Sequence, residues 1–455
     1  MTHDHGPGGG ERYQKTKQSI NVRCRRGQTW VCSCRRCPAR STIPPRLTRP
    51  LPCRFPLMAS SSRPKIWIIG SGRLHLRIPL MQRLTADGFD VAAVGPDKGE
   101  ELDEAGFSYH RFPLRRALDP VGDWHAQDIL EGLMRQHRPD LVHSVNTKPS
   151  ILVPSAAARA NIPACVRTIT GMGALFSSSS PKALAMRWLY RRLQRRAAPA
   201  CHTTVFQNPD DQEYFKDHGL VVESTDELVL SSGIDVEPYI ASAGSPATRA
   251  ALKDDLGLDE KPVITMVSRL IRPKGISEFL EAASLVRARN PQVTFLLVGP
   301  EVDEGPTAFP AERVHRCPDV RFLGRRSDVP TLLAISDLFV LPTYLREGVP
   351  RVLLEAGALG LPLVTTDVPG CREVVRHGEN GVLVPERDGQ ALASTIFDLL
   401  ADPARRKRMG QASRELVTER FHLDIVSAAY ARIYRNALGI GESESRNITP
   451  MRHAA

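Results

Sequence analysis

From Lys65 onward, short apolar runs rich in β-branched residues alternate with helix-like patterns of apolar and polar positions. This alternation predicts parallel sheets covered by helices on both faces. The first series of predicted strands comprises residues 65–69, 90–94, 140–145, 164–170, 202–206 and 227–230. The second series comprises residues 262–268, 293–299, 319–323, 338–342, 362–366 and 381–384. The pattern therefore predicts an α/β fold with two doubly wound, Rossmann-like parallel-sheet domains.

The border between the two domains is expected near residues 231–236, which precede a polar segment at 241–260. The 455 residues are enough for two to three domains with a substantial core. Ligands of open α/β sheets bind beyond the carboxyl ends of the strands. Two such domains are therefore expected to face each other across a cleft lined by these loops.

Two glutamates, Glu347 and Glu355, follow the predicted strand at 338–342. Between them, Pro350 is expected to occupy the first helical position, because its ring fixes φ and it has no N–H to leave unpaired. A helix start with free amides at the positive end of its dipole suits a phosphate or diphosphate. The amides expected there belong to Gly348, Val349, Arg351 and Val352. The alternative is that Glu347 caps the helix and Glu355 lies on a solvated face.

A second candidate for phosphate binding follows the predicted strand at 262–268, where the loop carries Arg269 and Lys274. Arginine offers a planar fork of donors and lysine a point charge. Both would neutralise the negative charge that builds on a departing nucleoside diphosphate. This context favours a nucleotide-sugar ligand over the purely structural interpretation of the two glutamates.

The predicted loops of the first domain contain glycines where a strand meets a helix. Gly70 and Gly72 resemble the start of a dinucleotide fingerprint, but His75 occupies the place of its third glycine, so a nicotinamide oxidoreductase is disfavoured. These glycines are expected to let the backbone approach a sugar. A lone histidine such as His75 or His143 is more often a structural hydrogen bonder than a substrate contact. The other loop expected at this edge contains Thr170 and Gly171.

With the basic pair and the glutamate pair both present, the chain resembles a retaining glycosyltransferase of family four with a glycosyltransferase-B fold. The resemblance covers most of residues 64–438. Four stretches resemble bacterial members that build lipid-linked glycans, and they begin at Ile169, Phe206, Tyr344 and Asp367. The family often has a histidine in the loop that here reads Thr170-Gly171-Met172-Gly173. Because this chain has no histidine in that loop, the loop backbone or Thr170 would have to make the contact with the donor sugar.

The resemblance implies a role for each matching residue. Arg269 and Lys274 would hold the donor diphosphate, and Glu347 would hold donor-sugar hydroxyls near the anomeric carbon. Glu355 would bind the ribose hydroxyls. The family retains the anomeric configuration, and a front-face displacement needs no protein nucleophile, so Glu347 is expected to position the sugar. No D-x-D motif occurs in the chain, which predicts transfer without a metal or other cofactor.

The resemblance also suggests how the chain is divided. Residues 61–235 would form the acceptor-side domain and residues 236–420 the nucleotide-sugar-binding domain. A helix at 421–438 would cross back to the first domain. Residues 1–60 would be a disordered or wrongly annotated extension, with Met58 as the working start, and residues 439–455 a tail.

The charge of the chain is concentrated in its first sixty residues. They hold a net charge of +10 out of +11 for the whole chain, so the rest is nearly neutral and no nucleic-acid partner is expected. They also hold Cys24, Cys32, Cys34, Cys37 and Cys53, whose spacing lacks the paired arms of a zinc ribbon. No apolar core typical of a signal peptide follows the basic residues. The other four cysteines are scattered, which favours a cytoplasmic location and makes the sequon at Asn447 fortuitous.

Residues 182–197 combine six basic side chains with apolar ones at nearly helical spacing. The segment is expected to be either a membrane-surface helix or an ordinary covering helix with a basic face. No run approaches the ~18 apolar residues of a membrane span, so the enzyme is expected to be either soluble in the cytoplasm or peripheral on the inner face of the plasma membrane. A polyprenyl-diphosphate-linked acceptor, with a UDP-sugar as donor, would favour membrane contact.

The residues and the resemblance together predict a hexosyltransferase in cell-surface polysaccharide biosynthesis, and the resemblance implies a UDP-sugar donor in place of a GDP-sugar. Two alternatives remain open. A nucleotide-sugar epimerase of the same fold would need groups that handle a proton at C2 of the sugar. A non-catalytic protein could bind a sugar nucleotide or a lipid diphosphate.

Overall fold

The computed structural model describes residues 20–23, 29–32, 63–115, 119–178, 180–258 and 261–440. Residues 1–59 form a unit separate from residues 60–455. In the first unit, β1 (Ile20–Arg23) pairs antiparallel with β2 (Thr29–Cys32). The predictions for the cysteine side chains of this unit, Met58, the sequon and the tail beyond residue 440 lie outside the described residues.

The N-terminal domain is built on a seven-stranded, fully parallel sheet of order β5-β4-β3-β6-β7-β8-β9. Its strands are β3 (Lys65–Ile69), β4 (Asp90–Gly95), β5 (Tyr109–Arg111), β6 (Leu141–Val145), β7 (Ala164–Ile169), β8 (Thr203–Phe206) and β9 (Asp226–Leu228). Its helices are α1 (Ile78–Ala86), α2 (Glu100–Glu104), α3 (Pro120–His137), α4 (Pro149–Ala160), α5 (Pro181–Ala197) and α6 (Pro209–Asp217). The chain reverses its direction of winding between β3 and β6, which are neighbours in the sheet.

The C-terminal domain repeats this plan with a six-stranded parallel sheet of order β12-β11-β10-β13-β14-β15. Its strands are β10 (Val263–Val267), β11 (Thr294–Val298), β12 (Val320–Gly324), β13 (Leu338–Leu341), β14 (Leu363–Thr366) and β15 (Gly381–Val384). Its helices are α7 (Val236–Ala241), α8 (Pro246–Asp255), α9 (Ile276–Arg289), α10 (Ala311–His315), α11 (Val329–Ala334), α12 (Arg351–Ala358), α13 (Cys371–Val374), α14 (Gly389–Ala401) and α15 (Pro403–Phe421).

The predicted fold class is confirmed, and the ends of the predicted strands lie within two residues of the observed ones. Three elements depart from the pattern. Strand β5 was not predicted, because its three residues are polar and only half-buried. Helix α8 occupies the segment expected to be a polar linker, and Ser245 caps its start by accepting from the Thr248 amide. Helix α12 begins at Arg351, so Pro350 precedes it instead of occupying its first position.

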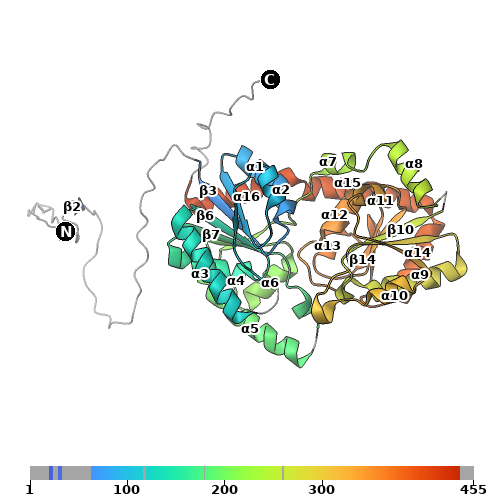
Figure 1. Cartoon of the computed structure of the whole chain (residues 1–455), viewed down its shortest axis with the longest axis horizontal. Helices are drawn as coiled ribbons and strands as arrows, with labels where there is room; N and C mark the ends of the chain where they lie inside the picture. The colour runs from blue at the N-terminus through green and yellow to red at the C-terminus, as the bar shows by residue number, and fades with distance from the viewer. Residues whose placement is uncertain are drawn as a thin grey trace, which may run out of the picture. The chain divides into compact units, whose positions relative to one another are not determined.

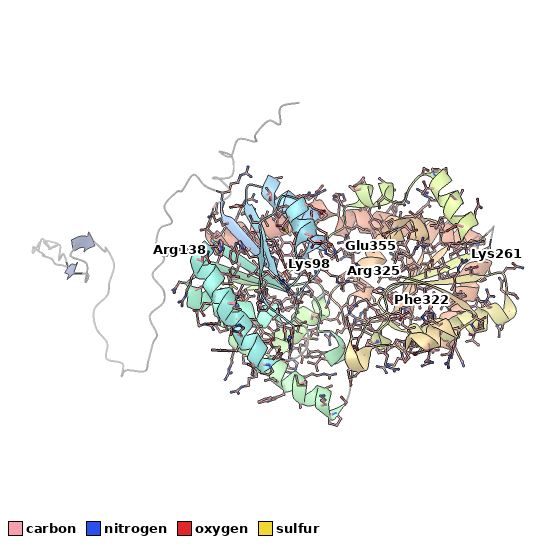
Figure 2. The ribbon with its side chains drawn as sticks, in the orientation of Figure 1. Lys98, Arg138, Lys261, Phe322, Arg325 and Glu355 are labelled. Atoms are coloured by element: carbon pink, nitrogen blue, oxygen red, sulfur yellow. The ribbon has the colours of Figure 1, made fainter. Side chains whose placement is uncertain are left out.

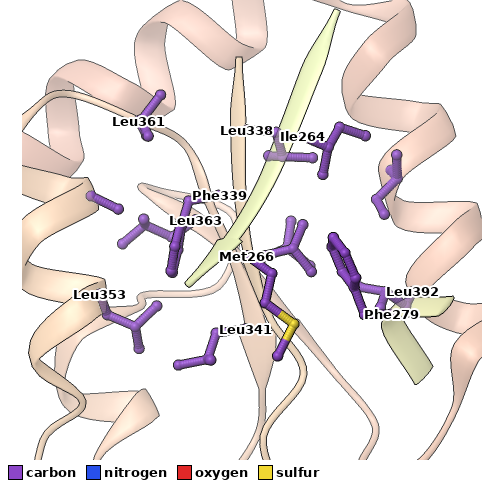
Figure 3. Close-up of a cluster of buried hydrophobic side chains, with 14 of the residues drawn as sticks. Ile264, Met266, Phe279, Leu338, Phe339, Leu341, Leu353, Leu361, Leu363 and Leu392 are labelled. Carbon is purple, nitrogen blue, oxygen red and sulfur yellow. The ribbon is translucent and has the colours of Figure 1, made fainter. Parts of the chain in front are cut away.

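The core of the C-terminal domain is continuous from the sheet into the helices on both faces. Strand residues such as Ile264, Met266 and Phe339 are fully buried, as the near-continuous apolar runs of a covered parallel sheet require. Figure 3 shows these side chains packed with Phe279 of α9 and Leu353 of α12. Helix α12 is thereby fixed on the sheet by its buried face, and this positions its N-terminal end at the sheet's carboxyl edge.

The last helix, α16 (Leu423–Leu438), packs on the N-terminal domain. Its residues Val426, Tyr430 and Tyr434 share a core cluster with Ile66 and Ile68 of β3. Figure 1 shows the red α16 beside the blue α1, at opposite ends of the described chain. The last helix therefore ties the chain back to the first sheet.

Candidate active site

The loops at the switch points of both sheets contain the predicted residues. The loop after β13 runs from Pro342 to Pro350 and packs against the turn that follows β10. The Tyr344 amide donates to the Pro273 carbonyl over 2.9 Å, and the Thr343 hydroxyl donates to the same oxygen over 3.0 Å. Gly275 has φ +79°, and a Cβ at that position would lie 2.0 Å from the Pro342 oxygen. These contacts bring the basic loop and the glutamate loop together.

Lys274 and Glu347 form an ion pair at this junction. The Lys274 side chain is buried, while the Glu347 carboxylate is about one quarter exposed at 23%. A lysine buried at this depth needs an anionic partner, because an unpaired ammonium is costly to remove from water. An incoming phosphate could replace the carboxylate as the partner of the ammonium. Glu347 would then be available to accept hydrogen bonds from hydroxyl groups.

Arg269 follows β10 and pairs with Glu304, a residue that the sequence did not single out. Glu304 belongs to the loop after β11, the neighbouring strand in the sheet. Several acidic residues follow β11 in sequence, and that charge run was the only signal that could have indicated a partner for Arg269. A diphosphate would compete with Glu304 for the guanidinium.

The start of α12 offers fewer free amides than the sequence predicted. The Gly348 amide donates to the Thr170 carbonyl over 3.0 Å, so it is already used in a contact between the domains. Within the described part of the chain, the amides of Val349, Arg351 and Val352 have no recorded acceptor. Two of these amides, those of Arg351 and Val352, belong to the first turn of α12, at the positive end of its dipole, and the Val349 amide precedes the helix.

Glu355, labelled in Figure 2, lies on α12 and accepts a hydrogen bond from Arg351 Nε over 2.8 Å. Burial raises the pKa of the Glu355 carboxyl above its ordinary value, and Arg351 opposes this shift.

Arg351 and Tyr239 line a cavity of about 240 Å³ between α1 and α7. The Tyr239 hydroxyl is buried without a hydrogen-bond partner among the described residues. A second cavity of about 450 Å³, between α9 and α10, contains none of the predicted residues.

The loops of the N-terminal domain meet the glutamate loop directly. Gly171 forms an antiparallel bridge with Glu347, and the Gly173 amide donates to the Arg346 carbonyl over 2.8 Å. Thr170 accepts from Asn146 Nδ2 over 3.3 Å, and the carbonyl of Thr170 accepts from Gly348 as described above. The predicted Thr170–Gly171 loop is thus brought to Glu347.

The Gly70–Gly72 loop is linked to the same group through Asn146. The Ser71 amide donates to Asn146 Oδ1 over 3.4 Å. Gly70 also has a packing role, because a Cβ there would lie 2.8 Å from the Leu74 side chain. Gly72 has φ +127°, a conformation that a side chain rarely adopts. Local packing and backbone conformation therefore explain why glycine occupies both positions. Contact of either glycine with a ligand stays a prediction.

Four residues of this junction were missed as functional candidates: Gln207, Asn208, Asp211 and Arg346. Asn208 Nδ2 donates to the Gly348 carbonyl over 3.1 Å, and Arg346 Nε donates to Asp211 Oδ1 over 2.9 Å. The run Asn208-Pro209-Asp210-Asp211 has the form of a helix cap followed by an acidic first turn, which gives no indication of a long-range partner. Their contact lies between residues about 140 positions apart, and local patterns cannot show it.

The two histidines considered from sequence lie away from this junction. His143 is fully buried, with its ring nitrogens 2.6 Å from the Tyr434 hydroxyl and 2.7 Å from the Thr168 hydroxyl. Burial lowers the pKa of His143 to about 3. His75 lies near Glu101 at 4.0 Å on the surface. The contacts of His143 are those of a structural histidine, whereas those of His75 do not decide its role.

Among the described residues, one group has the composition of a metal site: Asp235, Glu237 and His422. Their ligand atoms lie within 4.8 Å of one another at the border of the two domains. Arg83 already pairs with Asp235 at 3.0 Å, and His422 with Glu237 at 3.1 Å. The cluster is therefore a set of ion pairs apart from the Glu347 loop.

Helix α5 confirms the helix expected over 182–197. Some of its basic side chains bond to other parts of the N-terminal domain, and Arg192 lies over an exposed aromatic ring. Arg191 and Arg195 are bonded inward, to the Tyr214 hydroxyl and the His218 carbonyl. Leu184 and Trp188 are exposed at 53% and 63%. Arg192 lies over the Trp188 ring at 5.8 Å. Within the part of the chain that the structure describes, no helix combines the length and the apolar character needed to cross a bilayer.

Two family descriptions match the chain. Residues 79–230 match the glycosyl transferase 4-like domain, and residues 248–416 match the glycosyl transferases group 1 family. Arg269, Lys274, Glu347 and Glu355 fall in the second match, and Thr170 and Gly171 fall in the first.

Similar proteins include the N,N'-diacetylbacillosaminyl-diphospho-undecaprenol alpha-1,3-N-acetylgalactosaminyltransferase of Campylobacter jejuni. It is 26% identical over 368 residues, which cover 80% of this chain and 96% of the relative. The UDP-Gal:alpha-D-GlcNAc-diphosphoundecaprenol alpha-1,3-galactosyltransferase of Escherichia coli is 28% identical over 73% of this chain and 85% of its own length. Among solved structures, Anabaena HepE in complex with UDP-glucose has a TM-score of 0.68 at 21% identity, over 82% of this chain and 99% of HepE. That likeness shows the fold.

Proposed function

The chain is a glycosyltransferase with a glycosyltransferase-B fold, composed of a 4-like and a group 1 domain, and we propose that it transfers a hexose or N-acetylhexosamine from a UDP-sugar to a polyprenyl-diphosphate-linked glycan. The observation that carries this proposal is the Lys274–Glu347 ion pair, which lies beside the start of α12 and is bridged to Gly171 of the opposite domain. The relatives support the substrates, because two of them are named for undecaprenyl-diphosphate-linked acceptors and one of these for a UDP-sugar donor.

The reaction breaks the bond between the anomeric carbon and the diphosphate oxygen, so negative charge builds on the leaving phosphate. Lys274, Arg269 and the free amides of α12 would stabilise that charge. They are held by the sheet edge before the donor arrives, which limits the reorganisation needed during the reaction. Release of Lys274 from Glu347, and of Arg269 from Glu304, would accompany binding of the diphosphate.

Glu347 would then bind hydroxyls of the donor sugar and orient its anomeric carbon. We assign it this positioning role, since a front-face displacement that retains configuration lets the leaving phosphate take the acceptor proton. Glu355 would bind the ribose hydroxyls through the oxygen not engaged by Arg351.

A transfer assay with the full chain tests the proposal directly. The chain is incubated with radiolabelled UDP-hexoses and UDP-N-acetylhexosamines and an undecaprenyl-diphosphate-linked sugar, and the lipid phase is extracted. Label on the lipid supports the proposal. An isomerised donor would indicate an epimerase, and saturable UDP-sugar binding with neither product would indicate a non-catalytic binding protein. Either of these results contradicts the proposal.

We further propose that α5 contacts the membrane surface that holds the acceptor. The exposed Leu184 and Trp188 would enter the interfacial region, and Arg192 would meet anionic headgroups. Co-sedimentation with phosphatidylglycerol-containing vesicles should fall at least threefold for Trp188→Ser. Trp124→Ser, which changes an equally exposed tryptophan of α3, is the matched control. Equal losses for both variants would show that α5 is not the contact.

A further inference from the structure

The peptide between Glu347 and Gly348 is enclosed by backbone from both domains. A Cβ on Gly171 of the N-terminal domain would lie 2.4 Å from the Gly348 nitrogen. A Cβ on Gly370 of the C-terminal domain would lie 2.8 Å from the Glu347 oxygen of this peptide and 2.1 Å from the Gly348 oxygen of the next one. Such approaches are open only to glycine, so this peptide is held in one place from two sides.

Asn208 holds the same peptide from the start of α6. Its side chain is fully buried, and its two ends do different things. Oδ1 accepts from the Asp211 amide over 2.8 Å and so caps the helix. Nδ2 donates to the carbonyls of Gly348 over 3.1 Å and Glu347 over 3.3 Å. Capping needs only an acceptor. The donor end bonds to the two carbonyls of the opposite domain and, over 3.1 Å, to the Asp211 carboxylate of its own helix.

Asp211 holds Arg346, the residue that precedes Glu347 in the sequence. Its buried carboxylate accepts from Arg346 Nε over 2.9 Å and from Asn208 Nδ2 over 3.1 Å. The Arg346 guanidinium also lies over the Tyr214 ring at 5.5 Å. A buried carboxylate without a partner is strongly unfavourable, so Asp211 favours the arrangement in which Arg346 is docked.

We propose that Asn208 and Asp211 are positioning residues, through which the N-terminal domain orders the Glu347 loop of the C-terminal domain. The inference rests on the proposed role of Glu347 in transfer. It adds that Glu347 is aligned only while the two domains are apposed, because both residues act on main-chain and side-chain atoms of the opposite domain. Separation of the domains would release the loop and stop turnover without removing the diphosphate-binding groups.

Asn208→Ser separates the two functions of the asparagine, because serine is a good helix cap but cannot donate to both carbonyls. We expect kcat to fall about 10- to 100-fold, since small displacements of an aligned group have effects of this size. The dissociation constant for UDP should change less than about threefold, and the apparent KM for the donor should follow it. A merely structural role would change stability and affinity together.

Asp388→Ser is the matched control. Asp388 caps α14 in the C-terminal domain by accepting from the Ala391 amide over 2.8 Å, and no recorded hydrogen bond joins it to the Glu347 loop. This variant should keep wild-type kcat, whatever its shift of melting temperature. An equal loss of kcat in both variants would overturn the inference.

Hydrogen exchange of the segment 344–349 gives a readout that does not depend on turnover. In Asn208→Ser and Asp211→Asn the Gly348 amide should exchange at least about tenfold faster than in the wild type, while the amides of β13 should not change. Unchanged exchange at Gly348 would overturn the inference even if activity falls.

Glu347→Gln, assayed in parallel, separates failure of this inference from failure of the proposed function. If Glu347→Gln loses turnover and Asn208→Ser does not, the positioning role is wrong and the role of Glu347 stands. If Glu347→Gln retains turnover, the role of Glu347 is wrong, and the exchange of Gly348 alone decides whether the N-terminal domain orders the loop.

Discussion

The two domains contribute opposite kinds of group to the junction between their sheets. The C-terminal domain supplies charges: Arg269 and Lys274 as cations, Glu347 and Glu355 as anions. Apart from the Asp211 carboxylate, which holds Arg346, the N-terminal domain supplies neutral backbone and amide groups to the Glu347 loop, from Thr170, Gly171 and Asn208. The difference indicates a division of labour. Charge that binds a diphosphate is held in one domain, and geometry is imposed from the other.

The largest expected effect comes from a change on the charged side. Glu347→Gln keeps the shape of the side chain but removes its charge and weakens its bonds to sugar hydroxyls. We expect kcat to fall about 10³-fold, the loss typical of one preorganised polar group. UDP affinity, measured by titration calorimetry, should change less than about threefold. Glu301→Gln, an exposed carboxylate beyond β11, is the control and should retain wild-type kcat. A parallel loss of turnover and UDP affinity would contradict the division of labour.

A change on the neutral side should come next. Gly171→Ala places a Cβ 2.4 Å from the Gly348 nitrogen, and Gly171 has φ +100°. We expect kcat to fall about 10²-fold as the bridge to Glu347 is displaced. Gly173→Ala is a matched control, because Gly173 also has positive φ, at +69°, but a Cβ there would meet nothing within 4 Å. Equal losses in both variants would assign the effect to backbone strain, and not to the contact between domains.

A smaller effect, and one confined to binding, is expected at the second glutamate. Glu355→Ala removes the proposed ribose contact and leaves Arg351 without its partner. The dissociation constant for UDP should rise about 10- to 30-fold, as expected for hydrogen bonds to a charged group. At saturating donor, kcat should change less than about threefold. Glu355→Gln, which keeps one acceptor, should lie between the wild type and Glu355→Ala. A loss of kcat as large as that of Glu347→Gln would remove the distinction between the two glutamates.

The charged side of the junction was largely predictable from sequence, whereas the neutral side was not. Arg269, Lys274, Glu347 and Glu355 follow apolar strands at short, fixed distances, and parallel strands bring their carboxyl ends to one edge. The ion pair between Lys274 and Glu347 was not foreseen, because it depends on how two loops about seventy residues apart pack.

Contacts between domains left no local signal. Asn208 has the sequence signature of a helix cap, and its second role toward Gly348 is visible only in three dimensions. The same holds for the amide of Gly348, which was expected to be free and instead donates to Thr170. Strand β5 was not predicted because its polar residues do not form an apolar run.

The last prediction concerns stability in place of turnover or binding, and its effect should be confined to the N-terminal domain. His143 is the only fully buried histidine among the described residues, and its pKa is lowered to about 3. In the unfolded chain its pKa is about 6.5. Between these values the unfolded state binds a proton that the folded state does not, so the contribution of His143 to stability is present above pH 6.5 and is lost as the pH falls toward 3. The loss should be about 1.4 kcal/mol per pH unit.

Urea unfolding at a series of pH values, compared with His143→Gln, isolates this contribution from that of the acidic groups. Glutamine removes the titration and can still bond to Thr168 or Tyr434, which lie 2.7 and 2.6 Å from the ring nitrogens. The difference in free energy of unfolding between wild type and variant should narrow as the pH falls. Hydrogen exchange should locate the acid-induced loosening in β6 and β7 before β10 and β13. If both sheets loosen together, the two domains unfold as one unit, and the comparison drawn between them would hold for chemistry but not for stability.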